Sequence, residues 1–174
     1  MRNKIISIIL GVIALIATLF WCWLHHPLPR YEGEISLSGL KESVDIYTDE
    51  YGVPHVFAKN ENDLFFTAGY LAARERLFQL STVALAVRGE LASALGDDLL
   101  GSDIYLRTWR IHATAKKIVA AMTPENRKIF EAFCDGINAR IDEVKSDPPV
   151  EFKILGIDPP YWDPNIVAGY ARMM

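Results

Sequence analysis

Cysteine is scarce in this chain of 174 residues, which contains only Cys22 and Cys134. Cys22 lies in an apolar run and Cys134 in a helical pattern, so we expect no disulfide bond between them. The sequence has no internal repeats and no low-complexity tracts. Its length suits one domain that can bury a core.

An excess of basic residues is also missing. Residues 1–30 hold three basic residues and no acid, so the remaining 144 residues carry 15 basic and 22 acidic groups, a net charge of −7. Phosphate binding needs clustered Lys and Arg, and no basic stripe with interleaved aromatic residues is present. We therefore predict no nucleic-acid partner.

A long uncharged run is present at the N-terminus. Residues 5–24 contain no charge, and a helix of that length crosses a hydrocarbon core of about 30 Å. Arg2 and Lys4 precede the run, so the positive-inside rule places residues 1–4 in the cytoplasm. This pattern predicts a transmembrane signal-anchor in the inner (cytoplasmic) membrane, with a single pass and the body on the periplasmic or extracellular side.

A cleaved signal peptide is the competing interpretation of this run. It needs a shorter apolar core and small residues before the cut. Bulky residues, among them Phe20, Trp21 and Trp23, crowd that region. We therefore favour the uncleaved anchor, followed by a linker over residues 25–43 in which Pro27 and Gly39 disfavour regular structure.

A β-hairpin is predicted near residues 44–58. Val44, Ile46 and Thr48 alternate with polar or aromatic residues, which is typical of a half-buried strand. Gly52 and Pro54 then mark a turn.

Helices dominate the rest of the pattern. A helix capped by Asn62 or Asp63 runs on, or breaks and restarts, through 81–95 and ends at Gly96. Residues 101–103 offer the cap of a helix to about Met122, and Thr123-Pro124 begins another. Its apolar face is formed by Phe130, Phe133, Ile137, Ile141 and Val144.

The C-terminal part combines irregular and helical signals. Pro148-Pro149 ends the long helix, residues 151–156 are predicted to be extended, and Asp163-Pro164 begins a last helix. That helix keeps its apolar pattern to Met174 without a cap or polar tail. We therefore expect residues 44–174 to be an incomplete part of a domain.

Several short motifs occur in an order that resembles the penicillin acylase family of N-terminal-nucleophile hydrolases, in its N-terminal α-chain portion only. They begin with Asp49-Glu50-Tyr51-Gly52-Val53-Pro54-His55 and cover roughly residues 35–174. The motif residues, which we interpret as structural, are Asp49, Gly52, Pro54, His55, Gly69, Tyr70, Arg76, Gln79, Gly89, Gly136, Asn138, Phe152, Gly156, Trp162 and Pro164. Departures from the family pattern are Glu75 for an Asp, Ala84-Leu85 for paired arginines, and Ile166 for an Asp.

The resemblance implies an α+β protein, here a mostly helical fragment with an N-terminal β-hairpin, that forms part of an αββα sandwich. It implies an amidase whose precursor cuts itself and whose new N-terminal Ser attacks the amide bond, with its own α-amino group as base. Family calcium ligands and substrate-lining residues lie downstream. We therefore assign no catalytic, substrate-binding or metal residue and no cofactor to this chain.

Other motifs favour ordinary structural roles. Ser38 and Lys41 match the S-x-x-K pattern of penicillin-binding enzymes, but both companion motifs are missing. His55 could act as a general base, although a strand His more often satisfies a carbonyl group. Asp49 and Glu50 could bind calcium, although adjacent acids usually form a solvated turn. Glu75 and Arg76 are expected to form an ion pair.

We conclude that the chain is the scaffold portion of a membrane-anchored acylase that hydrolyses acyl amides of the penicillin or acyl-homoserine-lactone type, and that it is inactive alone. Its expected partners are the membrane and the C-terminal catalytic β-chain. The alternative is a non-catalytic truncated remnant or a membrane-tethered helical binding module. The nucleotide sequence beyond codon 174 would discriminate between them.

Overall fold

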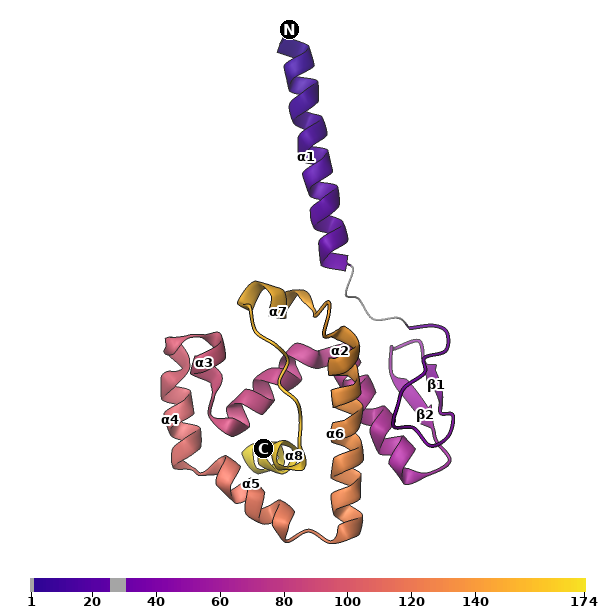
Figure 1. Ribbon diagram of the computed structural model, residues 1–174, viewed down its shortest axis with the longest axis vertical. Helices are drawn as coiled ribbons and strands as arrows, with labels where there is room; N and C mark the ends of the chain where they lie inside the picture. The colour runs from indigo at the N-terminus through magenta and orange to yellow at the C-terminus, as the bar shows by residue number, and fades with distance from the viewer. Residues whose placement is uncertain (1, 26–30) are drawn as a thin grey trace.

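The computed structural model describes residues 2–25 and 31–174, with side chains undescribed at positions 2–5, 7 and 23–25. Met1 of the predicted cytoplasmic segment and residues 26–30 of the predicted linker lie outside the described residues. Figure 1 shows a helix at the N-terminus that projects from a body of helices and one hairpin.

The projecting helix is α1 (Arg2–His25), and its described side chains are exposed. Within the described residues, none of the helices combines the length and the apolar character that crossing a membrane requires. The predicted localisation, a single-pass anchor over residues 5–24 in the inner membrane, is therefore contradicted. The uncharged run forms a helix, but the membrane span inferred from it is not found.

The predicted hairpin is present. Strand β1 (Asp45–Thr48) pairs antiparallel with β2 (Pro54–Phe57), and Asp45 stands opposite Phe57 in the register. All four residues of β1 are exposed, so the expectation of a half-buried strand is wrong. Tyr47 and Phe57 lie edge to face on the exposed surface, with ring centroids 5.7 Å apart.

Helix α2 (Glu61–Arg88) starts after a cap that lies two residues before the nearer predicted cap, Asn62, and it ends eight residues before Gly96. Its cap is Asn60, whose side chain accepts a hydrogen bond from the Asp63 amide at 2.9 Å. Arg76 has non-helical backbone angles and divides the helix at a kink. Gly89, with φ of +67°, ends the helix in the left-handed conformation.

A chain of short helices follows: α3 (Leu91–Leu95), the 3₁₀ turn η1 (Asp97–Leu99), α4 (Leu100–Thr108) and α5 (Ile111–Ala120). The single helix predicted to run to Met122 is therefore two helices. They break at Arg110, which is left-handed with φ of +54°, a conformation that a residue with a Cβ adopts at a cost.

The last three helices are α6 (Pro124–Val144), α7 (Val150–Leu155) and α8 (Pro164–Met173). The predicted caps are confirmed: the Thr123 side chain accepts from the Asn126 amide, and Asp163 accepts from the amides at 165 and 166. The extended piece predicted at 151–156 is wrong, because it forms α7. The buried Phe152 side chain orients that helix towards the core.

The body is built on the crossing of α2 and α6. Gly69 and Gly136 stand at the crossing, where a Cβ on Gly69 would lie 2.0 Å from the Phe133 carbonyl oxygen and one on Gly136 would lie 1.9 Å from that of Phe66. Two backbones can approach this closely only without side chains between them. The two glycines therefore set the separation of the helices.

Helix α8 lies inside the frame that α2, α4, α5 and α6 form (Figure 1). Ile166, at its first turn, is fully buried, and Gly169 packs against Val87 of α2. The residues of the main core come from α2, α5, α6, α7 and α8 and from the segment before α8: Ala73, Leu77, Ala84, Val87, Ile111, Cys134, Ile137, Ile141, Val144, Phe152, Trp162 and Ile166. Two of the predicted departures from the family pattern, Ala84 and Ile166, are therefore core positions.

Candidate functional site

The hairpin turn is organised around the Asp49 carboxylate. Its Oδ1 accepts hydrogen bonds from the amides of Tyr51 at 3.0 Å and Val53 at 2.9 Å, and its Oδ2 lies 3.1 Å from His55 Nε2. These bonds, that from Val53 foremost, hold the pKa of Asp49 below its usual value. Gly52 supplies the positive φ of +78°. The carboxylate thus binds its own turn.

The structure supports neither His55 as a general base nor Ser38 as an S-x-x-K nucleophile. His55 is about half exposed, and in the described part of the chain its hydrogen bond is to Asp49 rather than to a hydroxyl or thiol group. Ser38 forms an isolated β-bridge with Leu40. The S-x-x-K geometry requires the Ser to begin a helix, which Ser38 does not do. The Lys41 amide donates to Asp63.

Asp63 fastens the segment before the hairpin to α2. Its fully buried carboxylate accepts from the amides of Lys41 (2.9 Å) and Glu42 (3.0 Å) and from Asn60 Nδ2 (2.7 Å). Burial alone raises the pKa of Asp63, but these hydrogen bonds outweigh it and hold the pKa below its usual value. The sequence suggested a helix cap here and missed this longer-range role.

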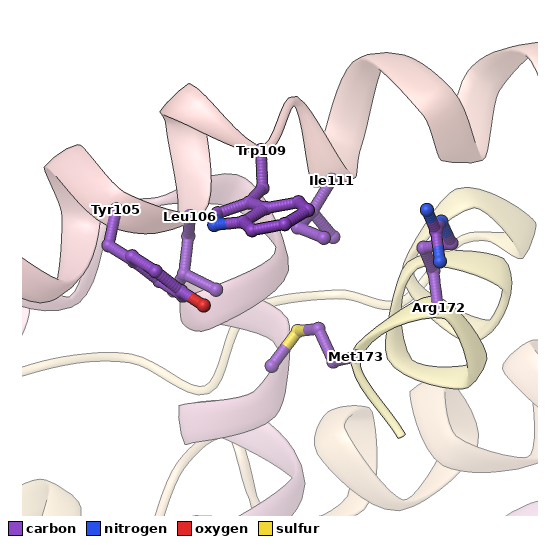
Figure 2. Close-up of a pocket in the computed structure, with 6 residues that line it drawn as sticks. All are labelled: Tyr105, Leu106, Trp109, Ile111, Arg172 and Met173. Carbon is purple, nitrogen blue, oxygen red and sulfur yellow. The ribbon is translucent and has the colours of Figure 1, made fainter.

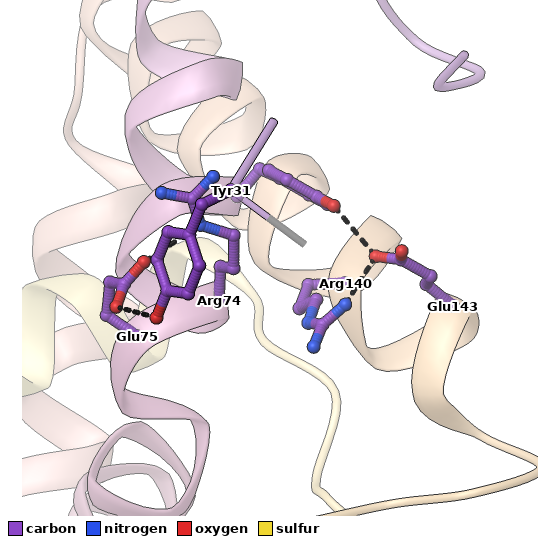
Figure 3. A network of polar contacts seen from close by, with 6 residues as sticks. Tyr31, Arg74, Glu75, Arg140 and Glu143 are labelled. Carbon is purple, nitrogen blue, oxygen red and sulfur yellow. Dashed lines mark hydrogen bonds and ion pairs between the residues drawn. The ribbon is translucent and has the colours of Figure 1, made fainter. Parts of the chain in front are cut away.

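Tyr70 joins α2 to α6 through a polar network, of which Figure 3 labels Arg140 and Glu143. Its hydroxyl donates to Glu143 Oε2 at 2.8 Å, and the buried Arg140 donates to the same oxygen at 2.8 Å. Burial, followed by the bond to Glu143, raises the pKa of Tyr70 to about 12. Tyr70 therefore remains a protonated donor at neutral pH.

A second network connects Tyr31 to α2 (Figure 3). The Arg74 guanidinium lies 4.9 Å from the centre of the Tyr31 ring, and the Tyr31 hydroxyl donates to Glu75 Oε2 at 3.1 Å. Glu75 pairs with Arg74 at 2.8 Å, so the predicted pair of Glu75 with Arg76 is wrong. Arg76 is exposed at the kink of α2.

Gly89 and Arg107 connect the end of α2 to α4. Arg107 Nε donates to the Gly89 carbonyl at 2.9 Å, and a Cβ on Gly89 would lie 2.7 Å from Arg107 Cγ. The buried Asp103 accepts from the amides of Leu91 and Ala92 at 2.9 and 2.8 Å. Asp103 therefore caps α3. The cap predicted at residues 101–103 is wrong, because these residues lie inside α4, which begins at Leu100.

The remaining motif residues fix the segment between α6 and α8. Asn138 and Trp162 exchange two hydrogen bonds: the Trp162 amide donates to Asn138 Oδ1 at 2.8 Å, and Asn138 Nδ2 donates to the Trp162 carbonyl at 2.9 Å. Phe152 packs edge to face on Phe78. Gly156, with φ of +65°, ends α7. Pro164 is the first residue of α8, and Gln79 is exposed on α2.

A groove lies between α4, α5 and α8 (Figure 2). Its volume is about 260 Å³, and its lining residues are Tyr105, Leu106, Trp109, Ile111, Arg172 and Met173. Two large aromatic side chains, Tyr105 and Trp109, line one wall with ring centroids 6.0 Å apart. The sequence analysis did not predict this groove, because the break at Arg110 between α4 and α5 is not visible in the periodicity.

No group of three or more His, Cys, Asp or Glu side chains within the described ranges is arranged to hold a metal ion. The calcium ligands that the family resemblance places downstream remain a prediction.

The penicillin amidase family model matches residues 43–174, which is more than half of the chain. The chain belongs to the penicillin amidase family. The match covers the hairpin, the crossing helices and α8, and it leaves α1 outside.

Named relatives agree with this assignment. A 129-residue stretch, 72% of this chain, is 35% identical to penicillin G acylase of Escherichia coli and covers 15% of that protein. Acyl-homoserine lactone acylase QuiP of Pseudomonas fluorescens (strain Pf0-1) is 28% identical over 164 residues, 94% of this chain and 20% of that protein. The chain thus spans a fifth or less of the length of these two relatives.

A solved structure shows the same fold. A chain of the thermostable penicillin G acylase from Alcaligenes faecalis superposes with a TM-score of 0.67 at 30% identity, over 74% of this chain and 69% of that one. The prediction of a mostly helical body with an antiparallel hairpin, from the N-terminal portion of this family, is confirmed.

Proposed function

We propose that this chain is the scaffold portion of an acylase that hydrolyses acyl-amide bonds, of the kind found in penicillins or acyl-homoserine lactones. The observation that carries the proposal is the family match over residues 43–174, together with relatives named as penicillin and acyl-homoserine lactone acylases. The relatives disagree on the acyl substrate, so the proposal names the bond and leaves the acyl group open.

The nucleophile, in this proposal, belongs to polypeptide beyond the matched portion. The motif side chains described above use their polar atoms to fasten turns, caps and helix crossings, which is the behaviour expected of a framework. One relative, from Pseudomonas sp. (strain SE83), is named as a proenzyme and is matched over 18% of its length. The match covers 69% of the solved Alcaligenes faecalis chain, so that chain is much shorter than the full-length relatives. This length is consistent with a precursor that is processed into separate chains.

The exposed hairpin has a role in the same proposal. A two-stranded hairpin is marginally stable in water, and strands β1 and β2 carry exposed apolar residues such as Ile46 and Phe57. We propose that the hairpin extends the sheet of the catalytic portion. The oxyanion donors and the attacking hydroxyl would then come from that portion.

A chimera tests the proposal. Residues 43–172 of this chain replace the matched segment of Escherichia coli penicillin G acylase, and hydrolysis of penicillin G is followed by the release of titratable acid. We expect the chimera to hydrolyse penicillin G, whereas the 174-residue chain alone and the Escherichia coli protein without its segment do not. A chimera that is produced in soluble form but is no faster than the truncated protein would refute the proposal, and so would hydrolysis by the isolated chain.

A further inference from the structure

The hairpin is held to the body mainly at its base. Strands β1 and β2 pair only with each other in the described part of the chain, and Figure 1 shows them beside the start of α2. All four residues of β1 are exposed, and in β2 only Pro54 and Val56 are half-buried. Because packing against the body is slight, the direction of the hairpin depends on the residues at its two ends.

One side chain, that of Asp63, contacts both ends of the hairpin. Lys41 and Glu42 precede β1, and their amides donate to Oδ1 at 2.9 Å and to Oδ2 at 3.0 Å. Asn60 follows β2, and its Nδ2 donates to Oδ2 at 2.7 Å. The Asn62 side chain donates to Oδ1 at 3.4 Å. The carboxylate is fully buried, so donors that lose it would find no water in its place.

The segment that leads into β1 contacts α2 a second time, at Gly39. This glycine has φ of +121°, and a Cβ on it would lie 2.7 Å from Cε2 of Phe66. Phe66 is buried and lies one turn after Asp63 on α2. Two attachment points on one helix fix the direction of the segment, whereas one point would allow it to pivot.

We infer that Asp63 is a positioning residue, which closes the base of the hairpin and sets the direction in which β1 and β2 project from α2. Without this carboxylate the hairpin would pivot on the contact between Gly39 and Phe66. Under the proposed function, on which this last step rests, a hairpin of fixed direction joins the catalytic sheet without a further loss of conformational freedom.

Spin labels measure the direction of the hairpin in the 174-residue chain. One label is attached at Tyr51→Cys in the exposed turn and the other at Lys128→Cys on α6, in a Cys22→Ser background in which the remaining native cysteine, Cys134, is buried. Asp63→Asn keeps one acceptor oxygen but turns the other into a donor that faces donors. We expect it to widen the distribution of label distances by about twofold or more, because a segment with few buried contacts opens locally.

The matched control is Glu42→Gln, at the same base of the hairpin. It makes the same change from acid to amide and removes an exposed ion pair with Lys59 at 3.3 Å, but it keeps the Glu42 amide that donates to Asp63. We expect this variant to give the distance distribution of the parent.

Hydrogen exchange separates a local effect from a loss of the whole fold. We expect Asp63→Asn to lose more protection in β1 and β2 than in α6. A distance distribution as narrow as the parent's, or equal widening by Glu42→Gln, would overturn the inference. So would complete unfolding or an equal loss of protection in the hairpin and α6, because Asp63 would then support the whole body instead of positioning the hairpin.

An activity measurement tests the step that rests on the proposed function. The chimera with penicillin G acylase, extended to begin at residue 35, is expected to hydrolyse penicillin G several-fold more slowly with Asp63→Asn than with Glu42→Gln. Equal rates in an active chimera would overturn the role of Asp63 in joining the sheet. An inactive parent chimera would refute the proposed function, and the label distances would still decide whether Asp63 positions the hairpin.

Discussion

Replacing Gly136 by Ala tests the account of the α2–α6 crossing most directly. The new Cβ would lie 1.9 Å from the Phe66 carbonyl oxygen and 2.8 Å from the Tyr70 amide nitrogen. Both are backbone atoms of α2, so no side-chain rotation relieves the contact. The helices must move apart.

The size of this movement sets the energetic cost. A carbon and a carbonyl oxygen rest at about 3.3 Å, so the helices must separate by roughly 1.4 Å at this point. Overpacking a core costs about 1–3 kcal/mol, while Ala in a helix recovers up to about 1 kcal/mol relative to Gly. Because the separation also loosens the core around Ile137, we expect a net loss near the upper end, about 2 kcal/mol. That corresponds to a decrease in Tm of about 4–8 °C.

Urea and thermal denaturation of the 174-residue chain measure the effect. The control is Gly101→Ala in α4, where a Cβ meets nothing within 4 Å and the substitution should be stabilising by about 0.5–1 kcal/mol. Gly69→Ala should resemble Gly136→Ala, and the double variant should lose less than the sum because one separation accommodates both. If Gly136→Ala and Gly101→Ala differ by less than about 0.5 kcal/mol, the crossing is not limited by these glycines.

Three further predictions concern side chains that the fold buries wholly or in part. Cys134 is buried and burial raises its thiol pKa to about 12, so the native chain should take up one maleimide, at the exposed Cys22, by mass spectrometry; double labelling without denaturant would contradict this. The pKa of Asp63 is lower when folded than its usual 3.8, so its stabilisation is present above about pH 4 and is lost as the pH falls further. Asp63→Asn should therefore unfold at a lower urea concentration than the parent at pH 7. The difference between the two urea midpoints should become smaller in acid. Asn138→Ala should cost about 1–3 kcal/mol and speed hydrogen exchange at the Trp162 amide, and unchanged exchange would show that this hydrogen-bond pair does not hold the segment.

Features that depend on residues close in sequence could be predicted. The caps at Thr123 and Asp163 join residues no more than three apart, and the proline after each suits the first helical position. The hairpin follows equally from alternation and a turn. The degree to which the hairpin is buried does not follow from the sequence. The exposure of β1 depends on what covers the strand rather than on the alternation of its residues.

Features that depend on distant contacts could not be predicted. Residues 151–156 contain two large apolar residues in alternation and suggest a strand, but Phe152 is buried against Phe78 and the segment forms a helix. The sequence places a cap at residues 101–103, yet Asp103 lies in the first turn of α4 and its carboxylate caps α3, twelve residues earlier. In both cases a tertiary contact decided between two locally acceptable structures.

The family motif identified several residues without revealing what they do. Gly69 and Gly136 belong to separate motifs, and only their positions in space show that each provides room for the opposite helix. The same is true of Asn138 and Trp162, whose hydrogen bonds connect motifs 24 residues apart.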